Sequence, residues 1–271
     1  MYPIDTGLDA VVTPKAPVQA VLFDVYGTLF ISRAGDIGAA KEEAARNIDA
    51  IAELCARHGI TMPVSPMLDA FFECIGTIKR ALRDGKGIQY PEVVIEDIWS
   101  SLLGVTDISL LQSFALEYEM IVNPVYPMPH LQELLSACKR GKVVMGIISN
   151  AQFYTPYLFV SLLGQSLTEL GFREDLLLFS YMLGYCKPSH EPFERAAQVL
   201  KESGIDATNT LYVGNDMRKD IAPSAAAGFQ TALFAGDARS LNLREEDQSC
   251  AHIRPDIIIT DLAQIIECLA S

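Results

Sequence analysis

Short, continuous apolar runs of strand length recur along this chain. They lie at Val18–Phe23, Val143–Ile148, Leu176–Phe179, Leu211–Val213, Thr231–Phe234 and Ile257–Ile259. Runs that stay apolar at nearly every position are typical of strands covered on both faces. Amphipathic helical patterns precede three of the later runs, at Leu131–Arg140, Glu191–Ser203 and Ile221–Ala227. This alternation predicts an α/β fold with a Rossmann-like parallel sheet and helices on both faces.

Residues 33–121 break this rhythm and carry helical patterns instead. From Asp36 to His58 the apolar residues recur at steps of three and four, as on one helix face. Further helical patterns follow at Met67–Arg83, Val93–Leu103 and Ser109–Ile121. A proline-rich segment at 123–129 then marks a stiff return connection. We therefore expect an α/β core domain, 1–32 and 122–271, interrupted by an all-helical domain at 33–121.

Polar residues follow four of the apolar runs, in an order that suggests a common site. They are Asp24 with Thr28, Ser149 with Asn150, Lys187 before a proline, and the segment Gly214–Asp220. Each feature alone also fits a turn, a helix cap or a solvated loop. The carboxyl ends of parallel strands meet at one edge of a sheet, however, and ligands bind there. A buried carboxylate such as Asp24 is costly unless it is paired or used.

With these four segments in order, the sequence resembles the haloacid dehalogenase-like hydrolase superfamily. The resemblance covers nearly the whole chain, and the helical insertion resembles the helical cap of that family. It implies that Asp24 is a nucleophile that forms a covalent aspartyl intermediate. It implies that Lys187 neutralises the charge of nucleophile and substrate. Thr28 and Ser149 match the groups that hold the transferred group, with Asn150 beside them.

The resemblance also implies a metal site. Asp24, Asp216 and the backbone carbonyl of Tyr26 match the metal ligands of the family, while Asp220 and Asn215 match positions that support the metal or the lysine. Three carboxylates in one small site are not balanced by a single lysine, least of all when a phosphate arrives. A hard divalent cation with oxygen ligands restores the balance, and Mg²⁺ fits because it needs few protein carboxylates.

Tyr26 departs from the phosphatase pattern. Phosphatases of the family usually have an aspartate two residues after the nucleophile as general acid and base, whereas Asp-x-Tyr-Gly-Thr-Leu is similar to the 2-haloacid dehalogenase branch. A phenol with an unperturbed pKa of ~10 is a poor base at neutral pH. General acid–base catalysis contributes ~10²–10⁴-fold, however, against accelerations of up to ~10²¹-fold for phosphate monoesters. A phosphatase for good leaving groups is compatible with this loss.

Dehalogenation makes a different demand on the site. The reaction uses no metal, and Asp216 and Asp220 would repel its carboxylate substrate. That branch has a tyrosine six residues after the lysine, where this chain has Phe193. It also has a halide-binding arginine in the cap, which no motif identifies here. Five arginines are available, all expected on solvated surfaces: Arg33, Arg46, Arg57, Arg80 and Arg83.

The sequence therefore favours a Mg²⁺-dependent phosphohydrolase that acts on a small phosphorylated metabolite through a phospho-aspartyl intermediate at Asp24. Two alternatives stay open. One is a 2-haloacid dehalogenase-type hydrolase that uses Asp24 without metal. The other is a catalytically weak binding protein of the same fold.

Composition narrows the partners and the compartment. The 271 residues include 21 Lys and Arg against 34 Asp and Glu, a net charge of −13. This acidity disfavours nucleic acid and anionic membrane surfaces as partners. No apolar run approaches the ~18 residues of a membrane span, and the first residues do not resemble a secretory signal. Six cysteines without a CxxC pair indicate reduced thiols. We expect a cytoplasmic monomer or homodimer.

Overall fold

The computed structural model describes residues 1–32 and 37–269. The chain forms two compact units, each of which is described by itself. The core unit comprises Met1–Ile31 and Tyr126–Ser271, and the helical unit comprises Ser32–Val125. The sequence-derived boundaries at 33 and 121 stay a prediction of where independent domains begin and end.

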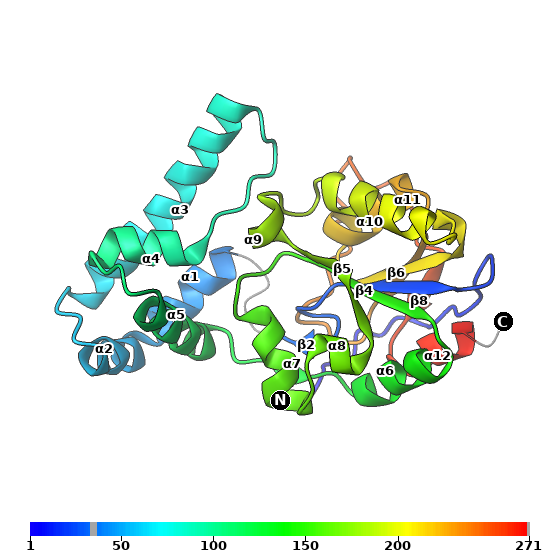
Figure 1. The fold of residues 1–271 in the computed structure, drawn as a ribbon, viewed down its shortest axis with the longest axis horizontal. Helices are drawn as coiled ribbons and strands as arrows, with labels where there is room; N and C mark the ends of the chain where they lie inside the picture. The colour runs from blue at the N-terminus through cyan, green and yellow to red at the C-terminus, as the bar shows by residue number, and fades with distance from the viewer. Residues whose placement is uncertain (33–36, 270–271) are drawn as a thin grey trace. The chain divides into compact units, whose positions relative to one another are not determined.

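A six-stranded parallel sheet forms the centre of the core unit (Figure 1). Its strands are β1 (Ala20–Phe23), β4 (Val144–Ser149), β5 (Phe172–Phe179), β6 (Thr210–Gly214), β7 (Gln230–Phe234) and β8 (Ile257–Ile259). The spatial order is β5-β4-β1-β6-β7-β8, and Phe23 of β1 is in register with Ile147 on one side and Val213 on the other. The chain thus winds outward in both directions from β1, which creates the switch point where open α/β sheets bind ligands.

The apolar runs that predicted these strands are buried for the expected reason. Every residue of β1, β6 and β7 is buried, because helices cover both faces of the sheet. The strand β5 begins four residues before the predicted run, with Arg173, Glu174 and Asp175 inside it. It is an edge strand, where charged side chains can remain in solvent, and so its first half lacks the buried-strand pattern. The predicted α/β fold is confirmed.

Helices cover both faces of this sheet. Figure 1 shows α10 and α11 on one side of the sheet, and α6 and α12 on the other. The helices of the core unit are α6 (Leu131–Arg140), α7 (Thr155–Leu163), α8 (Leu167–Leu170), α9 (Ser180–Leu183), α10 (Glu191–Glu202), α11 (Ala222–Ala226) and α12 (Gln264–Leu269). A 3₁₀ turn, η1, spans Ala207–Asn209, and a π-helical turn, η2, spans Met217–Ile221. The helix predicted from Ile221 therefore begins earlier, and its first turn is widened.

A short antiparallel pair of strands lies where the chain leaves the core unit and where it returns to it. The strand β2 (Phe30–Ile31) pairs with β3 (Tyr126–Pro127), and Met128 N–H donates to the carbonyl of Leu29 at 2.9 Å. Two-residue strands are too short to produce a hydrophobic period, so the sequence did not predict them. They bring the exit and the return of the chain side by side.

The helical unit consists of α1 (Ile37–Arg46), α2 (Ile48–Arg57), α3 (Val64–Lys86), α4 (Ile95–Leu103) and α5 (Ile108–Val122). Its described residues contain no named strand. The single helix expected from Asp36 to His58 was wrong, because the helix breaks at Asn47. The Asn47 side chain donates to the carbonyl of Glu43 at 2.8 Å, a local bond that competes with helical geometry. Asp36 itself, like Arg33, lies outside the described residues.

An aromatic cluster forms the centre of the helical unit. Trp99, the one tryptophan of the chain, is fully buried. Its ring stacks on Phe71 with centroids 4.1 Å apart, and the rings of Phe114 and Tyr118 meet it edge-on at 4.9 and 5.2 Å. Aromatic pairs in these geometries contribute ~0.5–1.5 kcal/mol beyond their buried area. Trp99 fluorescence is therefore a probe of this unit alone.

Two broader properties follow from the described residues. None of their helices is both long and apolar enough to cross a membrane. All six cysteines are free thiols, and four of them are buried: Cys55, Cys138, Cys250 and Cys268. Burial raises the pKa of the Cys138 thiol to about 12, which keeps it protonated and unreactive.

We predict that Phe71→Ala lowers the free energy of unfolding of the helical unit by about 3–5 kcal/mol, because it removes the ring stacked on Trp99 and leaves a cavity. Urea titration followed by Trp99 fluorescence measures this loss. Met120→Ala on α5 is the matched control, since its side chain is 64% exposed, and a change within about 0.5 kcal/mol is expected there. Equal effects of the two variants would show that the cluster is not the stabilising centre of the unit.

Candidate active site

Asp24 lies directly after β1, at the central strand of the sheet. Its N–H donates to the carbonyl of Val213, which extends the ladder of β6 by one residue. Its Oδ1 accepts from Ser149 Oγ at 2.8 Å and lies 2.7 Å from Lys187 Nζ. Among the described residues nothing bonds to Oδ2, which is also not sealed from solvent. One oxygen is thus fixed, and the other is available to a ligand.

Lys187 is a buried cation that joins two carboxylates. Its Nζ lies 2.5 Å from Asp220 Oδ1 and donates to Tyr212 Oη at 3.1 Å, in addition to its contact with Asp24. The three N–H donors of the ammonium therefore all have partners. Burial alone lowers the pKa of Lys187, but Asp220 and Asp24 outweigh it and raise the pKa above its ordinary value. The side chain is charged at neutral pH.

Asp220 supports this lysine. Its Oδ1 contacts Lys187 and accepts from Tyr212 Oη at 2.9 Å, while its Oδ2 accepts from the N–H groups of Asn215 and Asp216 at 3.1 and 3.0 Å. Burial raises its pKa to about 6, so it is still ionised at neutral pH. Of the two supporting functions that the family resemblance implied, the contacts match the one toward Lys187.

Gly214 makes room for that carboxylate. A Cβ at this position would lie 2.4 Å from Asp220 Cγ. This close approach explains why a glycine ends β6 at the site, since any side chain would push Asp220 away from the lysine.

Tyr212 is a site residue that the sequence analysis missed. It lies in the fully buried strand β6, and burial raises its pKa well above the ordinary value, so its hydroxyl stays protonated. The sequence did contain a sign of this: a tyrosine lies inside an apolar run that was expected to be buried. A buried tyrosine hydroxyl needs a hydrogen-bond partner. Phe193, fully buried on α10, packs its ring against Tyr212 with centroids 5.1 Å apart. Phe193 is thus a core residue that supports this tyrosine.

Asn150 holds the lysine segment through its backbone. Its Oδ1 accepts from Lys187 N–H at 2.6 Å, and its Nδ2 donates to the Lys187 carbonyl at 3.2 Å. The amide therefore fixes the main chain on which the catalytic lysine candidate sits. Its expected place beside the transferred group stays a prediction.

The turn after Asp24 packs closely against two other segments. Gly27 has φ +81°, and a Cβ there would lie 2.6 Å from both Asn215 Nδ2 and Ser240 Cβ. Thr28 Oγ1 donates to Asn215 Oδ1 at 3.3 Å, and Asn215 Nδ2 donates to the Ser240 carbonyl at 2.6 Å. Glycine is required here both by the backbone conformation and by the lack of space. Asn215 thereby links the nucleophile turn to the segment around Ser240.

The phenol hydroxyl of Tyr26 bonds to the first residue of a helix, α7. Its Oη lies 2.8 Å from Oγ1 of Thr155, the fully buried first residue of α7. Either hydroxyl can donate in this pair. Thr155 is a second partner that the sequence analysis did not identify, since nothing in its local pattern indicates a contact 129 residues away.

Both carboxylate oxygens of Asp216 have hydrogen-bond partners in the protein. Its Oδ1 accepts from the N–H groups of Arg218 and Lys219 at 2.9 and 3.0 Å, which caps η2. Its Oδ2 accepts from Arg244 Nη2 at 2.6 Å and from Arg244 Nε at 3.2 Å. Burial alone raises the pKa of Asp216, but the bonds from Arg244 and Lys219 outweigh it and lower the pKa. The acid is therefore ionised and paired.

Arg244 corrects the charge count of the sequence analysis, which balanced three carboxylates against one lysine. Among the described residues two cations contact the three acids, Lys187 and Arg244. No motif surrounds Arg244, which lies in the acidic segment Leu243-Arg-Glu-Glu-Asp247. The contact of Arg244 with Asp216 was not readable from the sequence, because Arg244 does not follow an apolar run of strand length.

The donors fit Mg²⁺ in kind and number. The implied ligands are Asp24, Asp216 and the carbonyl of Tyr26, all of them hard oxygen donors. Among residues 1–32 and 37–269 no three His, Cys, Asp or Glu side chains converge on a metal position. Mg²⁺ does not require such a cage, because it binds through one or two carboxylates and keeps several waters. Asp24 would supply a carboxylate oxygen to such an ion, while Asp216 is bound to Arg244.

Two arginines of the helical unit, Arg46 and Arg57, are paired with acids of the same unit. Arg46 contacts Glu42 and Glu43, and Arg57 contacts Glu117. Both side chains are more than half exposed, as expected for solvated helix faces.

Comparison with known proteins gives two relatives by sequence. A glyceraldehyde 3-phosphate phosphatase from Methanocaldococcus jannaschii is 24% identical over 217 residues, which cover 79% of this chain and 83% of the relative. A phosphoglycolate phosphatase from Neisseria gonorrhoeae is 33% identical over 143 residues, which cover 52% of this chain and 55% of the relative.

Solved structures give the same fold. A 2-haloacid dehalogenase from Pseudomonas syringae superposes with a TM-score of 0.57 at 21% identity, over 93% of this chain and 98% of the other. A hydrolase from Bacillus subtilis, solved bound to magnesium, has a TM-score of 0.51 at 20% identity, over 94% and 100% of the two chains. At these identities the likeness shows the fold alone. The family described as haloacid dehalogenase-like hydrolase matches residues 18–228, and the chain belongs to that family.

Proposed function

We propose that this hydrolase is a phosphohydrolase that uses Asp24 as its nucleophile. The observation that carries the proposal is the carboxylate of Asp24, with Oδ1 held by Ser149 and Lys187 and with Oδ2 unbonded among the described residues. A nucleophile needs one fixed, reactive atom directed at the substrate. The names of the two relatives by sequence, both phosphatases, support phosphate as the transferred group.

The reaction has two steps at Asp24. Oδ2 attacks phosphorus and forms an acyl phosphate, while the bond from phosphorus to the leaving oxygen breaks. Water then attacks the same phosphorus, which releases inorganic phosphate and restores the carboxylate. Lys187 offsets the negative charge around Oδ1 during both steps, and Thr28 and Ser149 are the hydroxyls next to the transferred group.

Mg²⁺ is the proposed cofactor. Asp24, Asp216 and the Tyr26 carbonyl would hold it, and it would neutralise charge on the phosphate. The magnesium in the B. subtilis hydrolase supports this choice for a chain of the same fold.

The proposed substrates are small phosphorylated metabolites with good leaving groups. The reason is Tyr26, which stands where a carboxyl group would protonate the leaving oxygen and whose hydroxyl is paired with Thr155. An acyl phosphate or an aryl phosphate needs little protonation as it leaves. Such a substrate tolerates the absence of a carboxylic acid at position 26.

A 2-haloacid dehalogenase is the second candidate, and one observation favours it. Each of the three site acids contacts a cation, Asp24 and Asp220 through Lys187, and Asp216 through Arg244. The expected repulsion of a carboxylate substrate by Asp216 and Asp220 is therefore weaker than the sequence suggested. In this reaction Asp24 Oδ2 displaces halide from carbon and water then hydrolyses the resulting ester.

We predict that Asp24→Asn reduces turnover by about 10⁴-fold or more while the fold is retained, because it removes the nucleophile. Phosphate release from 4-nitrophenyl phosphate and chloride release from 2-chloropropionate are measured side by side. Asp69→Asn is the matched control, an exposed aspartate of the helical unit that should leave both rates unchanged. An active Asp24→Asn enzyme would exclude Asp24 as nucleophile in either reaction.

Metal removal separates the two candidates. Phosphate release should be lost in excess EDTA and return when Mg²⁺ is added, because the dianionic substrate needs the cation. Chloride release from 2-chloropropionate should be indifferent to EDTA. Phosphatase activity that persists in EDTA would contradict the Mg²⁺-dependent reaction, and chloride release alone would replace the phosphatase proposal with the second candidate.

Substitutions at Tyr26 test the leaving-group argument. Tyr26→Asp should raise kcat/KM for phenyl phosphate by up to about 10²-fold, the lower end of general acid catalysis, and change 4-nitrophenyl phosphate much less. Tyr26→Phe, which keeps the ring and removes the hydroxyl, is the control and should not show this selective gain. If Tyr26→Asp changes both substrates equally, protonation of the leaving group does not limit this enzyme.

A further inference from the structure

The contact between Arg244 and Asp216 occupies a carboxylate that the proposed function assigns to a metal. A carboxylate has about four lone-pair positions. Two main-chain N–H groups bond Oδ1 of Asp216, and Nη2 and Nε of Arg244 bond Oδ2, with Nε also 3.4 Å from Oδ1. The side chain of Asp216 is only 3% exposed, so water does not offer it an alternative partner. A metal therefore reaches Asp216 only when one of these bonds opens.

Of these bonds, the ones from Arg244 can open without unfolding a helix. The N–H groups on Oδ1 belong to the first turn of η2, whose main chain they hold in place. Arg244 contributes only a side chain, which is one-third exposed. The guanidinium is thus the exchangeable partner of the carboxylate.

Main-chain hydrogen bonds join the segment that carries Arg244 to the segment around Asp216. Met217 N–H donates to the carbonyl of Asn242, and Asn242 N–H donates to the carbonyl of Asn215, both at 2.9 Å. Cys250, buried against Met217 and Leu233, lies with its Sγ 3.9 Å from the Arg244 carbonyl. These contacts fix the base of the arginine side chain close to Asp216, and they do not depend on the guanidinium itself.

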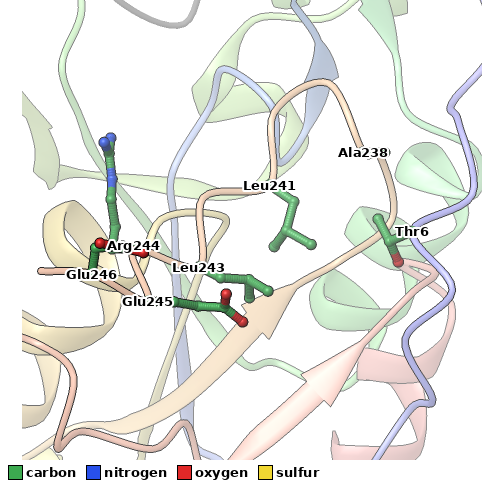
Figure 2. A pocket seen from close by; sticks show the side chains of 7 residues that line it. All are labelled: Thr6, Ala238, Leu241, Leu243, Arg244, Glu245 and Glu246. Atoms are coloured by element: carbon green, nitrogen blue, oxygen red, sulfur yellow. The ribbon is translucent and has the colours of Figure 1, made fainter.

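The backbone conformation of Arg244 is unusual and sets the direction of its side chain. Its φ is +53°, in the left-handed region that is unfavourable for a residue with a Cβ. The neighbouring residues line a shallow cavity of about 370 Å³ together with Thr6. Figure 2 shows that the Arg244 side chain points away from Leu243 and Glu245 in this cavity. The side chain of Arg244 thus leaves the segment in a different direction from those of Leu243 and Glu245.

We propose that Arg244 is a resident counter-cation of Asp216 that competes with a divalent metal for the same carboxylate oxygen. The proposal rests on the metal function proposed above for Asp216. With the arginine bound, the acid is neutralised without metal. With the arginine released, Asp216 becomes a metal ligand. Arg244 therefore weakens the affinity of the site for Mg²⁺.

Direct measurement of metal binding tests this competition without any activity assay. The free Mn²⁺ signal in electron paramagnetic resonance is titrated with wild-type protein and with Arg244→Gln. We expect the variant to bind one Mn²⁺ about 10- to 100-fold more tightly, the range expected for loss of a charge-assisted pair on the ligand. Asp216→Asn should remove this ion and leave only weak binding by the acidic surface, which is subtracted.

Arg239→Gln is the matched control. Arg239 lies in the same segment and pairs with Asp237, a buried acid with no contact to Asp24, Lys187 or Asp216 among the described residues. Its Mn²⁺ affinity should equal that of the wild type. Equal tightening by both variants would mean that general charge, not the Arg244 contact, controls metal binding, and would overturn the proposal.

Arg244→Lys covers the case in which Arg244→Gln does not fold. Lysine keeps the charge but loses the bidentate contact, so the Mn²⁺ affinity of Arg244→Lys should rise by a smaller factor than that of Arg244→Gln. The melting temperature of Arg244→Lys should also rise more on addition of Mg²⁺ than that of the wild type. Unchanged Mn²⁺ affinity in the variants would overturn the competition even if Asp216→Asn shows that Asp216 binds the ion. Phosphatase activity can still be present in that outcome, so failure of this inference is distinguishable from failure of the proposed function.

Discussion

One buried ammonium holds the polar end of this sheet together. Lys187 contacts Asp24 after β1 and Asp220 in η2, and Asn150 after β4 fixes its main chain. Without it two buried carboxylates would repel each other across a site of low dielectric constant, and loss of one partner of such a pair typically costs ~3–5 kcal/mol. The lysine therefore offsets the negative charge of two buried acids and helps to set the relative positions of three strand ends.

The sequence predicted those features of the fold that depend on long, regular burial. All six strands of the sheet came from continuous apolar runs, because both faces of this sheet are covered. Features that depend on one local bond were not predicted. The break at Asn47 follows from a side chain that bonds the Glu43 carbonyl, and the β2–β3 pair involves only two residues on each strand. No periodic pattern can report either of them.

The same distinction applies to the site. Asp24, Ser149, Lys187, Asp216 and Asp220 were named from sequence because each follows an apolar run, and the sheet places such positions at one edge. The contacts between Asp24, Ser149, Lys187 and Asp220 were in this way predictable as a group. Arg244 was not, because it has no strand of its own and reaches the site through a segment docked on Asn215 and Met217.

Arg244 changes the electrostatic argument about the reaction. Three carboxylates with Lys187 and Arg244 leave one net negative charge, to which a monoanionic haloacid adds one and a dianionic phosphate adds two. If a divalent metal takes the place of Arg244, the protein site becomes neutral, and a bound phosphate dianion then leaves two negative charges. The arginine-bound site with a haloacid reaches the same total. On this charge count, exchanging one cation on Asp216 would match the site to either substrate charge, as the proposed competition between Arg244 and a metal requires.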